Sequence, residues 1–398
     1  MKKFKFTYKN IIAILFVVFI MVSFVLSFIT APTKILGGLA RGYLNSPEDT
    51  NVLSKIGNGF KDFDSRMSEY YVFHDISINS YGAVQNLIDK KLIDDVDPEY
   101  EVLKLNNGYL TFKHTSDEDL TNLGNYLIDI KSVCDKNNIN LMYINKLSKT
   151  TDDKDLLPAN YPYAHKSNYG ELKKRLMQNN IDVLDLQDVV DEQNIDKYSL
   201  FFKTDHHWTP KTGIWVSQLI TDKLNGLYNY NLNSDLYDIL NYNVETHYNA
   251  FLGSQGKRVG YLYAGTDDLD VITPKYDTNM SVKIAVSGEI LKGTFEDTII
   301  HRECITPDNL LNKDQTAYDT YMLGNHDLVE IENKNINDGK RALLILDSFG
   351  CVVAPYLSQN FQQLDCIDLR SYTGSLKDYI EETSPDVVIY MATEYQKN

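Results

Sequence analysis

Residues 201–210 have the sequence FFKTDHHWTP, which places acidic and imidazole side chains directly before the start of a helix. The apolar residues before this cluster predict a short strand over residues 199–202. Thr209 and Pro210 predict the helix start, because a hydroxyl caps the first turn well and proline at the first helical position loses no hydrogen bond. The polar cluster is therefore expected on a strand-to-helix turn, where α/β proteins usually build their sites.

Within this cluster, Asp205 and His207 are the residues suited to act together. They are two positions apart, so both lie on one side of an extended chain, and the carboxylate can orient the ring. His206 points to the other side and is interpreted as a structural residue. The three residues could also form half of a metal site, but no second His, Asp or Glu cluster at ligand spacing accompanies them. No metal is expected, and the stretch itself lacks a nucleophile.

Apolar periodicity on both sides of the cluster predicts alternating helices and strands. Helices are predicted over residues 120–133, 170–178, 209–224, 349–358 and 375–382, and strands over residues 139–144, 181–186, 342–346, 364–369 and 386–391. Residues 225–340 interrupt this order, because they are rich in Asn, Tyr and Asp with short apolar stretches, and they are expected to form a β-rich insertion. The alternation predicts an α/β domain with a doubly wound, mainly parallel sheet and helices on both faces.

Residues 343–350, with the sequence LLILDSFG, contain a candidate for the missing nucleophile. Ser348 follows a continuous apolar run typical of a buried parallel strand, so its hydroxyl should emerge at the carboxyl edge of the sheet. Backbone N–H groups at such a turn can stabilise an oxyanion. Taken alone, a serine at this place is equally well explained as a helix cap. On one sheet, however, Ser348 can meet Asp205 and His207 although they are distant in sequence.

The composition narrows the remaining classes of function. The chain has 398 residues, of which 43% are hydrophobic and 24% charged, enough for one large domain with an insertion or for two domains. Its formal net charge of −16 disfavours binding to nucleic acid or anionic lipid and suits neutral partners such as uncharged glycans. The four cysteines lack metal-ligand spacing, and Cys351 and Cys366 lie in apolar surroundings that favour buried free thiols.

The amino-terminal segment predicts a membrane helix. Four lysines precede an apolar stretch over residues 11–29, which is long enough to cross a bilayer. These lysines are Lys2, Lys3, Lys5 and Lys9. The stretch exceeds the apolar core of a signal peptide, and no clear cleavage pattern follows it. The expectation is an uncleaved single-pass anchor in the cell membrane, with its N-terminus in the cytoplasm and the rest of the chain outside.

Two motifs together resemble those of a known family. TDHHWT at residues 204–209, followed by LDSF at residues 346–349, resembles the DHHW-motif proteins, which are similar to the alginate O-acetyltransferase branch of the SGNH hydrolase-like superfamily. Shorter pieces add to the resemblance at residues 253–258, 324–325 and 368–370, so that it extends over most of the chain after the apolar stretch.

The resemblance implies an SGNH-like domain in which Ser348 is the nucleophile, His207 the general base and Asp205 its orienting carboxylate. In ordinary SGNH hydrolases the serine comes first, and the order found here is that of the acetyltransferase branch. The resemblance also implies a partner, a multi-pass membrane-bound O-acyltransferase that passes acetyl groups outward. The implied acceptor is an extracellular polysaccharide or a cell-wall glycan.

Further residues are candidates for binding the substrate or the oxyanion. Leu346 replaces the glycine that precedes Asp-Ser in many SGNH enzymes, and no Gly-x-Asn-Asp block is present. Asn325, next to Gly324, is the candidate substitute donor. Arg370 follows a predicted strand, where it could equally clamp a substrate oxygen or pair with an acid. Tyr372 is a candidate for a further donor.

The expected organisation is a cytoplasmic tail and anchor at residues 1–30, a stalk or packing segment at residues 31–100, and the SGNH-like domain at residues 101–398. The expected activity is transfer of an acetyl group to glycan hydroxyls through an acyl-serine, without a cofactor. A glycan acetyl esterase with the same triad is the first alternative. The second is a non-catalytic glycan-binding or scaffold subunit, whose contact surface would be the tyrosine-rich insertion.

Overall fold

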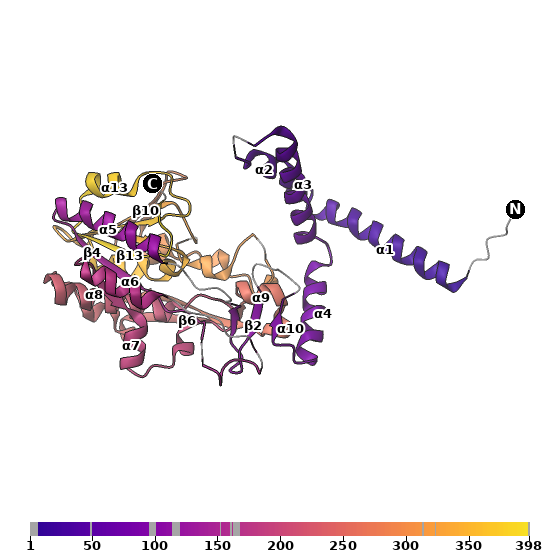
Figure 1. The fold of residues 1–398 in the computed structure, drawn as a ribbon, viewed down its shortest axis with the longest axis horizontal. Helices are drawn as coiled ribbons and strands as arrows, with labels where there is room; N and C mark the ends of the chain where they lie inside the picture. The colour runs from indigo at the N-terminus through magenta and orange to yellow at the C-terminus, as the bar shows by residue number, and fades with distance from the viewer. Residues whose placement is uncertain are drawn as a thin grey trace. The chain divides into compact units, whose positions relative to one another are not determined.

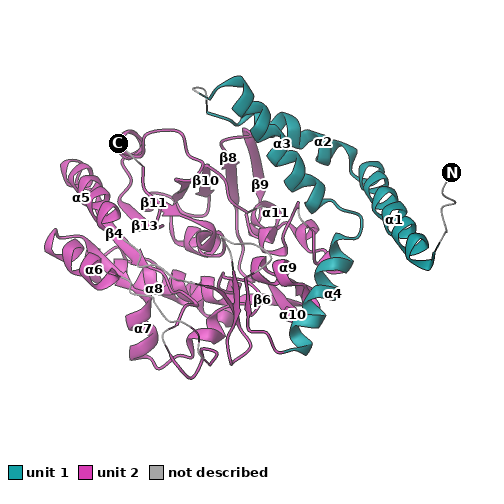
Figure 2. Cartoon of the chain, turned by 45° about the vertical axis from the view of Figure 1, so that its right-hand side comes forward, with its two compact units in different colours: residues 1–88 teal, residues 89–398 magenta. Residues whose placement is uncertain are grey.

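The computed structural model of the chain describes residues 7–47, 50–94, 101–113, 120–151, 153–159, 161, 168–312, 314–322 and 324–396. Lys2, Lys3 and Lys5 of the predicted cytoplasmic tail lie outside the described residues. The chain divides into two compact units, residues 1–88 and residues 89–398 (Figure 2).

The first unit consists of helices. They are α1 (Tyr8–Thr30), α2 (Pro32–Leu44), α3 (Val52–Glu69) and α4 (His74–Leu87). The predicted apolar stretch forms α1, which has 23 residues and contains an 18-residue segment with a mean hydropathy of 3.1, so it is long and apolar enough to cross a membrane. A single residue, Ala31, separates α1 from α2, because Pro32 takes the first position of the new helix.

The second unit is built on an eight-stranded sheet in the order β5-β4-β13-β11-β12-β10-β8-β9. Its strands are β4 (Asn140–Asn145), β5 (Asp182–Asp185), β8 (Met280–Ile284), β9 (Glu289–Gly293), β10 (Leu328–Asn333), β11 (Arg341–Leu346), β12 (Gln363–Asp368) and β13 (Val387–Met391). The pairs from β5 through β12 are parallel, which confirms the predicted parallel sheet. β10, β8 and β9 extend it with antiparallel pairs from the predicted β-rich stretch.

Helices cover both faces of this sheet, as predicted (Figure 1). α5 (Thr121–Lys136), α6 (Tyr169–Gln178) and α13 (Leu376–Thr383) pack on one face with side chains such as Leu343 and Ile345. α8 (Pro210–Tyr228), α12 (Ala354–Leu357) and the antiparallel pair β6 (Tyr242–Phe251) and β7 (Asp267–Pro274) pack on the other with Leu344 and Leu346. Successive side chains of β11 therefore pack into two hydrophobic cores, one on each face of the sheet, because side chains alternate across a strand.

Shorter elements complete the second unit. They are the small sheet of β1 (Leu92–Ile93), β2 (Val102–Lys104) and β3 (Leu110–Phe112), the helices α7 (Leu186–Glu192), α9 (Ser254–Val259), α10 (Tyr261–Ala264) and α11 (Phe295–Ile299), and 3₁₀ turns such as η1 (Lys197–Leu200), η6 (Ala317–Thr320), η7 (Ser348–Val352) and η8 (Ser358–Asn360). All four cysteines are buried free thiols.

Two predicted elements take another form. The strand expected over residues 199–202 is wrong: the 3₁₀ turn η1 forms there instead, because the Asp196 carboxylate accepts a hydrogen bond from Tyr198 N at 3.0 Å. The helix expected over residues 349–358 is broken into η7, α12 and η8. Pro355 explains the break, since its ring cannot donate to the previous turn and clashes with the carbonyl four residues before.

Candidate active site

The candidate nucleophile Ser348 lies directly beyond the carboxyl end of β11, a central strand of the sheet. Its neighbour Asp347 fixes the turn, because one carboxylate oxygen accepts a hydrogen bond from Phe349 N at 3.1 Å. The other oxygen is bonded to the ammonium group of Lys146, which follows β4. Residues that follow β11 and β4, two strands separated in the sheet by β13, thus hold the start of η7 in place.

The DHHW motif lies on a loop that closes on itself between η1 and α8. Phe201 and Trp208 form an antiparallel bridge that joins the two ends of this loop. The buried Asp267 carboxylate, at the start of β7, accepts hydrogen bonds from Lys203 N at 2.8 Å and from the Thr204 hydroxyl at 2.6 Å. The loop is therefore anchored from the β6–β7 pair as well as from α8.

A buried lysine lies beneath this loop. Lys149 is only 3% exposed, and its amine donates to the carbonyl oxygens of Phe202 at 2.8 Å and Asp205 at 2.6 Å. Burial lowers the pKa of Lys149 to about 7, against the opposing effect of the Asp205 and Asp267 carboxylates. The hydrogen bonds satisfy carbonyl groups that would otherwise be buried without a partner.

The structure brings Ser348, His207 and Asp205 into one hydrogen-bonded chain. Ser348 Oγ lies 2.6 Å from His207 Nε2, and His207 Nδ1 is hydrogen-bonded to Asp205 Oδ1. The same carboxylate oxygen accepts from His207 N at 2.9 Å. A carboxylate can only accept, so Nδ1 carries the hydrogen and Nε2 of the neutral ring is free to accept from the serine hydroxyl. A serine, a histidine and a carboxylate in this order can activate the serine hydroxyl as a nucleophile.

Asp205 is fully enclosed and ionised. Burial alone would raise its pKa, but His207, His206 and the N–H of Ser254 together hold the pKa of Asp205 well below its usual range. The Ser254 N–H donates to Asp205 Oδ2, so both carboxylate oxygens are used. Gly253 makes this approach possible, because a Cβ atom there would lie 2.1 Å from the Asp205 Cβ.

Aromatic rings hold the His207 imidazole on several sides. Tyr318, from η6, stacks on it with 4.3 Å between ring centroids and 13° between planes. Phe349 lies 5.0 Å away and His206 3.8 Å away by the same measure. Trp208 ties the loop to the serine turn by donating from Nε1 to the Phe349 carbonyl at 2.9 Å. The ring is thus restricted to the orientation that faces Ser348.

The Tyr318 stack provides a test of this restriction. The Tyr318 hydroxyl is buried and makes no hydrogen bond to the described residues, so Tyr318→Phe should keep near-normal activity. Tyr318→Leu should lower kcat roughly two- to thirteenfold, the equivalent of the ~0.5–1.5 kcal/mol that an aromatic pair typically contributes. Steady-state kinetics on both variants, with Tm measured alongside, check this. Equal kcat values for the two variants would contradict a role for the stacked ring.

His206 lies beside the chain of Ser348, His207 and Asp205 but is not part of it. Its Nδ1 is 2.9 Å from the Ser254 hydroxyl, and burial lowers the pKa of His206 to about 4. Asp205, His206 and His207 form a group whose potential ligand atoms lie within 4.8 Å of one another. Each of these residues already has a hydrogen-bond partner among the described residues, and the carboxylate oxygens are occupied by protein N–H groups.

The remaining candidates lie at differing places. Arg370 donates to the Asp368 carboxylate from Nε at 2.9 Å and to the side-chain oxygen Oδ1 of Asn325 from a terminal nitrogen at 3.0 Å. This fixes the Asn325 amide near η7, where Cys351 also contacts it at 3.6 Å. Tyr372 packs against Tyr379 with 6.2 Å between centroids, and within the described parts of the chain no contact joins Tyr372 to Ser348 or His207.

Sequence reasoning missed Tyr318, Lys149 and Asp267 as supports of the motif loop. Tyr318 is one of 28 tyrosines, and nothing local marks the one that meets an imidazole. Lys149 has the sequence setting of a solvent-exposed lysine. Among the supports of the motif loop, only Gly253 and Ser254 had a signal in the sequence. They lie in the GSQGKR segment, and short glycine-rich stretches often mark a close approach of two backbones.

The chain is similar to known proteins over most of the second unit. The DHHW protein family matches residues 172–367, a range that includes both the motif loop and Ser348. The family described as SGNH hydrolase-like domain, acetyltransferase AlgX, matches residues 108–231. No curated protein sequence matches the chain.

Solved structures show the same fold at low sequence identity. Bacillus cereus PatB1 is 21% identical, with a TM-score of 0.59, and the match covers 73% of this chain and 94% of PatB1. PatB1 with a sulfonyl adduct is 20% identical, with a TM-score of 0.58 over 73% of this chain and 93% of that one. A DHHW family protein from Eubacterium siraeum DSM 15702 is 16% identical, with a TM-score of 0.56 over 74% of this chain and 90% of the other. Residues 172–367 thus form a region of the DHHW protein family, and the chain is similar to the SGNH hydrolase-like acetyltransferase family over residues 108–231.

Proposed function

We propose that this protein is an extracytoplasmic O-acetyltransferase that moves an acetyl group onto glycan hydroxyls through an acyl-serine intermediate. The observation that carries the proposal is the hydrogen-bonded chain from Ser348 through His207 to Asp205. The similarity to an acetyltransferase domain over residues 108–231 supports the reaction class. Ser348 is the proposed nucleophile, His207 the general base and Asp205 the carboxylate that orients the base.

In the first half-reaction, Ser348 Oγ attacks the acetyl carbonyl carbon of the donor while its proton passes to His207 Nε2. The carbonyl oxygen becomes an oxyanion, and the tetrahedral adduct collapses when His207 returns the proton to the leaving group. Acetyl-Ser348 remains. Asp205 stabilises the transient imidazolium, which its buried and ionised state allows it to do.

In the second half-reaction, a sugar hydroxyl takes the place of the leaving group. His207 Nε2 accepts the hydroxyl proton while the sugar oxygen attacks the acetyl carbon. As the adduct collapses, the bond to Ser348 Oγ breaks, His207 returns the proton to Oγ, and the acetylated glycan is released. The proposed oxyanion donors are the Ser348 N–H and the Asn325 amide nitrogen. Arg370 supports the latter assignment, since it binds the Asn325 oxygen and leaves the NH₂ group for another acceptor.

The proposed setting is the outer face of the cell membrane. α1 would anchor the chain with its N-terminus in the cytoplasm, since it is long and apolar enough to span a bilayer and Lys9 lies near its start. A multi-pass membrane-bound O-acyltransferase is the proposed source of acetyl groups. The proposed acceptor is an extracellular polysaccharide or cell-wall glycan, and the net charge of −16 suits an uncharged sugar polymer.

A test uses the full-length purified protein with a chromogenic acetyl ester and a mixture of neutral glycan oligosaccharides. The expected result is ester turnover with acetyl groups appearing on oligosaccharide hydroxyls in the mass spectrum. Free acetate as the sole acetyl product would instead identify a glycan esterase. Absence of turnover, together with failure of a sulfonyl fluoride to label Ser348, would favour a non-catalytic subunit. The sulfonyl adduct of PatB1 motivates this choice of probe.

A further inference from the structure

The α2–α3 hairpin of the first unit is packed through glycines. A Cβ atom on Gly42 would lie 2.4 Å from the Asn58 carbonyl oxygen, and one on Gly59 would lie 2.8 Å from the Leu39 carbonyl oxygen. Gly38, one turn before Gly42, approaches the backbone of α3 equally closely. The two helices therefore touch through their backbones at these glycines, where no larger side chain would fit.

Polar side chains add to this inner face. Asn58 Nδ2 donates to the Ser46 hydroxyl at 2.9 Å, and Arg41 Nε donates to the Asp62 carboxylate at 2.9 Å. Both bonds join α2, or its end, to α3. Small residues and interhelical hydrogen bonds are the features that hold helices together in a lipid environment, where apolar side chains gain nothing by facing each other.

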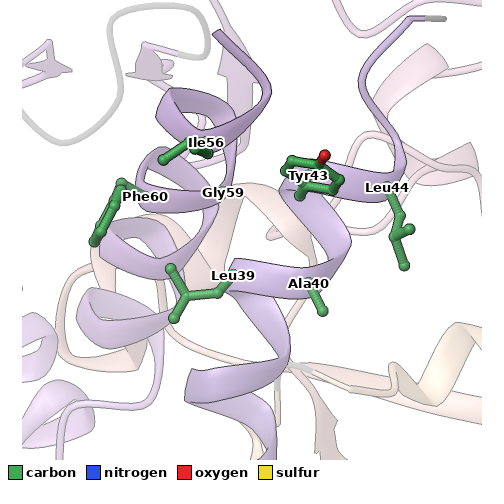
Figure 3. A pocket seen from close by; sticks show the side chains of 7 residues that line it. All are labelled: Leu39, Ala40, Tyr43, Leu44, Ile56, Gly59 and Phe60. Atoms are coloured by element: carbon green, nitrogen blue, oxygen red, sulfur yellow. The ribbon is translucent and has the colours of Figure 1, made fainter. Parts of the chain in front are cut away.

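Most large apolar side chains of the hairpin are exposed instead, and Ile35 is the one that is fully buried among the described residues. Leu53 is 81% exposed, Leu44 76% and Phe60 61%. Figure 3 shows a shallow apolar groove on this side, which is lined by Leu39, Ala40, Tyr43, Leu44, Ile56, Gly59 and Phe60. These residues, with Leu53, are called the hairpin face below. A two-helix hairpin in water would place such residues between the helices, so the packing is reversed with respect to a water-soluble hairpin.

The hairpin is continuous with the helix that can span a membrane. α2 begins at Pro32, two residues after α1 ends at Thr30. The far end of the hairpin also returns to α1, because the Phe63 and Phe28 rings lie 6.1 Å apart and Val72 N donates to the Ser27 hydroxyl at 3.0 Å. Both ends of the hairpin are thus held beside the carboxyl end of the same apolar helix.

The charge of the hairpin fits a lipid surface better than the charge of the whole chain does. Residues 31–69 contain five Lys or Arg and five Asp or Glu, whereas the whole chain has a net charge of −16. A neutral segment is not repelled by membrane headgroups. The 13 residues of α2 span about 20 Å at 1.5 Å per residue, less than the ~30 Å hydrocarbon core. The hairpin is therefore too short and too charged to cross the bilayer.

We propose that the hairpin face inserts among the phospholipid acyl chains of the leaflet next to the carboxyl end of α1. The occupant of the groove is lipid, and the hairpin lies in the membrane interface with its charged side chains at headgroup level. The protein is then attached to the membrane through two apolar elements, α1 and the hairpin face. This attachment is more durable than one through the shallow hairpin alone. This inference is independent of the acetyl-transfer chemistry.

The test places an environment-sensitive NBD fluorophore on single cysteines of the full-length protein in phosphatidylcholine vesicles. Leu53→Cys and Phe60→Cys report on the hairpin face. Ser65→Cys is the matched control, because Ser65 is exposed on α3 and lies roughly 140° around the helix axis from Phe60, at about 100° per residue. The native cysteines are all buried, and labelling of the unsubstituted chain measures any background.

The expected result is quenching of the probes at positions 53 and 60 by doxyl-labelled lipid, with protection from iodide in the water. The probe at position 65 should show the reverse. Iodide quenching at 53 and 60 equal to that at 65 would overturn the proposal, since the face would then be in water. Protection from both quenchers would also overturn it, because a protein surface, such as a second copy of the chain, would then cover the groove.

Discussion

Replacing Ser348 by alanine should abolish acetyl transfer, with a fall in kcat of as much as ~10⁶-fold if the full triad operates. The reason is that Ser348 Oγ, 2.6 Å from His207 Nε2, is the only proposed acceptor of the acetyl group in the mechanism. Alanine removes the attacking atom and leaves the imidazole, the carboxylate and the turn in place. The measurement is acetyl transfer from the chromogenic ester to oligosaccharide, together with intact-mass detection of acetyl-enzyme.

A matched control separates this effect from damage to the fold. Ser371 is an exposed serine in the turn after β12, and its hydroxyl makes one long contact of 3.4 Å to the Asp368 carbonyl. Ser371→Ala should therefore keep normal kcat and normal acetyl-enzyme formation. Near-normal transfer by Ser348→Ala, with Tm unchanged, would show that the chemistry does not pass through this serine.

The second large effect is expected for Asp205→Asn, which should lower kcat by about 10⁴-fold, the size of loss seen when a triad carboxylate becomes an amide. An amide can donate as well as accept, so the His207 ring can adopt the tautomer with hydrogen on Nε2, which cannot take the serine proton. The stabilisation of the imidazolium is also lost. KM should change little, because Asp205 is buried at 3% exposure and does not reach the substrate. Steady-state kinetics of the variant would measure both constants.

Asp308→Asn serves as the control for this variant, because Asp308 is an exposed carboxylate in a short 3₁₀ turn, η5 (Pro307–Asn309). It should leave kcat unchanged. If Asp205→Asn also kept its kcat while Ser348→Ala lost activity, His207 would have to be oriented by the Tyr318 and Phe349 rings alone. That outcome would reduce the proposed triad to a Ser-His pair.

The parts of the fold that local chemistry governs could be predicted from the sequence. The apolar run before Ser348 predicts a buried strand, and β11 is that strand. Thr209 and Pro210 predict the start of α8, which begins at Pro210 with the Thr209 hydroxyl as its cap. The two-residue spacing of Asp205 and His207 also pointed to their contact, although the backbone there is a closed loop and not a strand.

What depends on distant contacts could not be predicted. Tyr318 meets His207 because η6 folds over the motif loop, and the sequence of η6 carries no mark of that contact. Lys149 is buried because several backbone carbonyls of the loop converge on it, which only the folded chain reveals. The expected strand over residues 199–202 failed for a local reason, since the side chain of Asp196 started a 3₁₀ turn just before it.

The attachment of the motif loop to the β6–β7 region has a consequence for any attempt to shorten or transplant this site. Gly253 and Ser254, which follow β6, and Asp267, which opens β7, hold Thr204 and Asp205 from outside the helix and strand that flank the motif. A minimal version of the protein that kept β11, α8 and the motif but removed this hairpin would lose the partners of its acid. Grafting DHHW and Asp-Ser onto another sheet would therefore require the glycine-containing turn and the Asp267 strand to be carried along as one cassette.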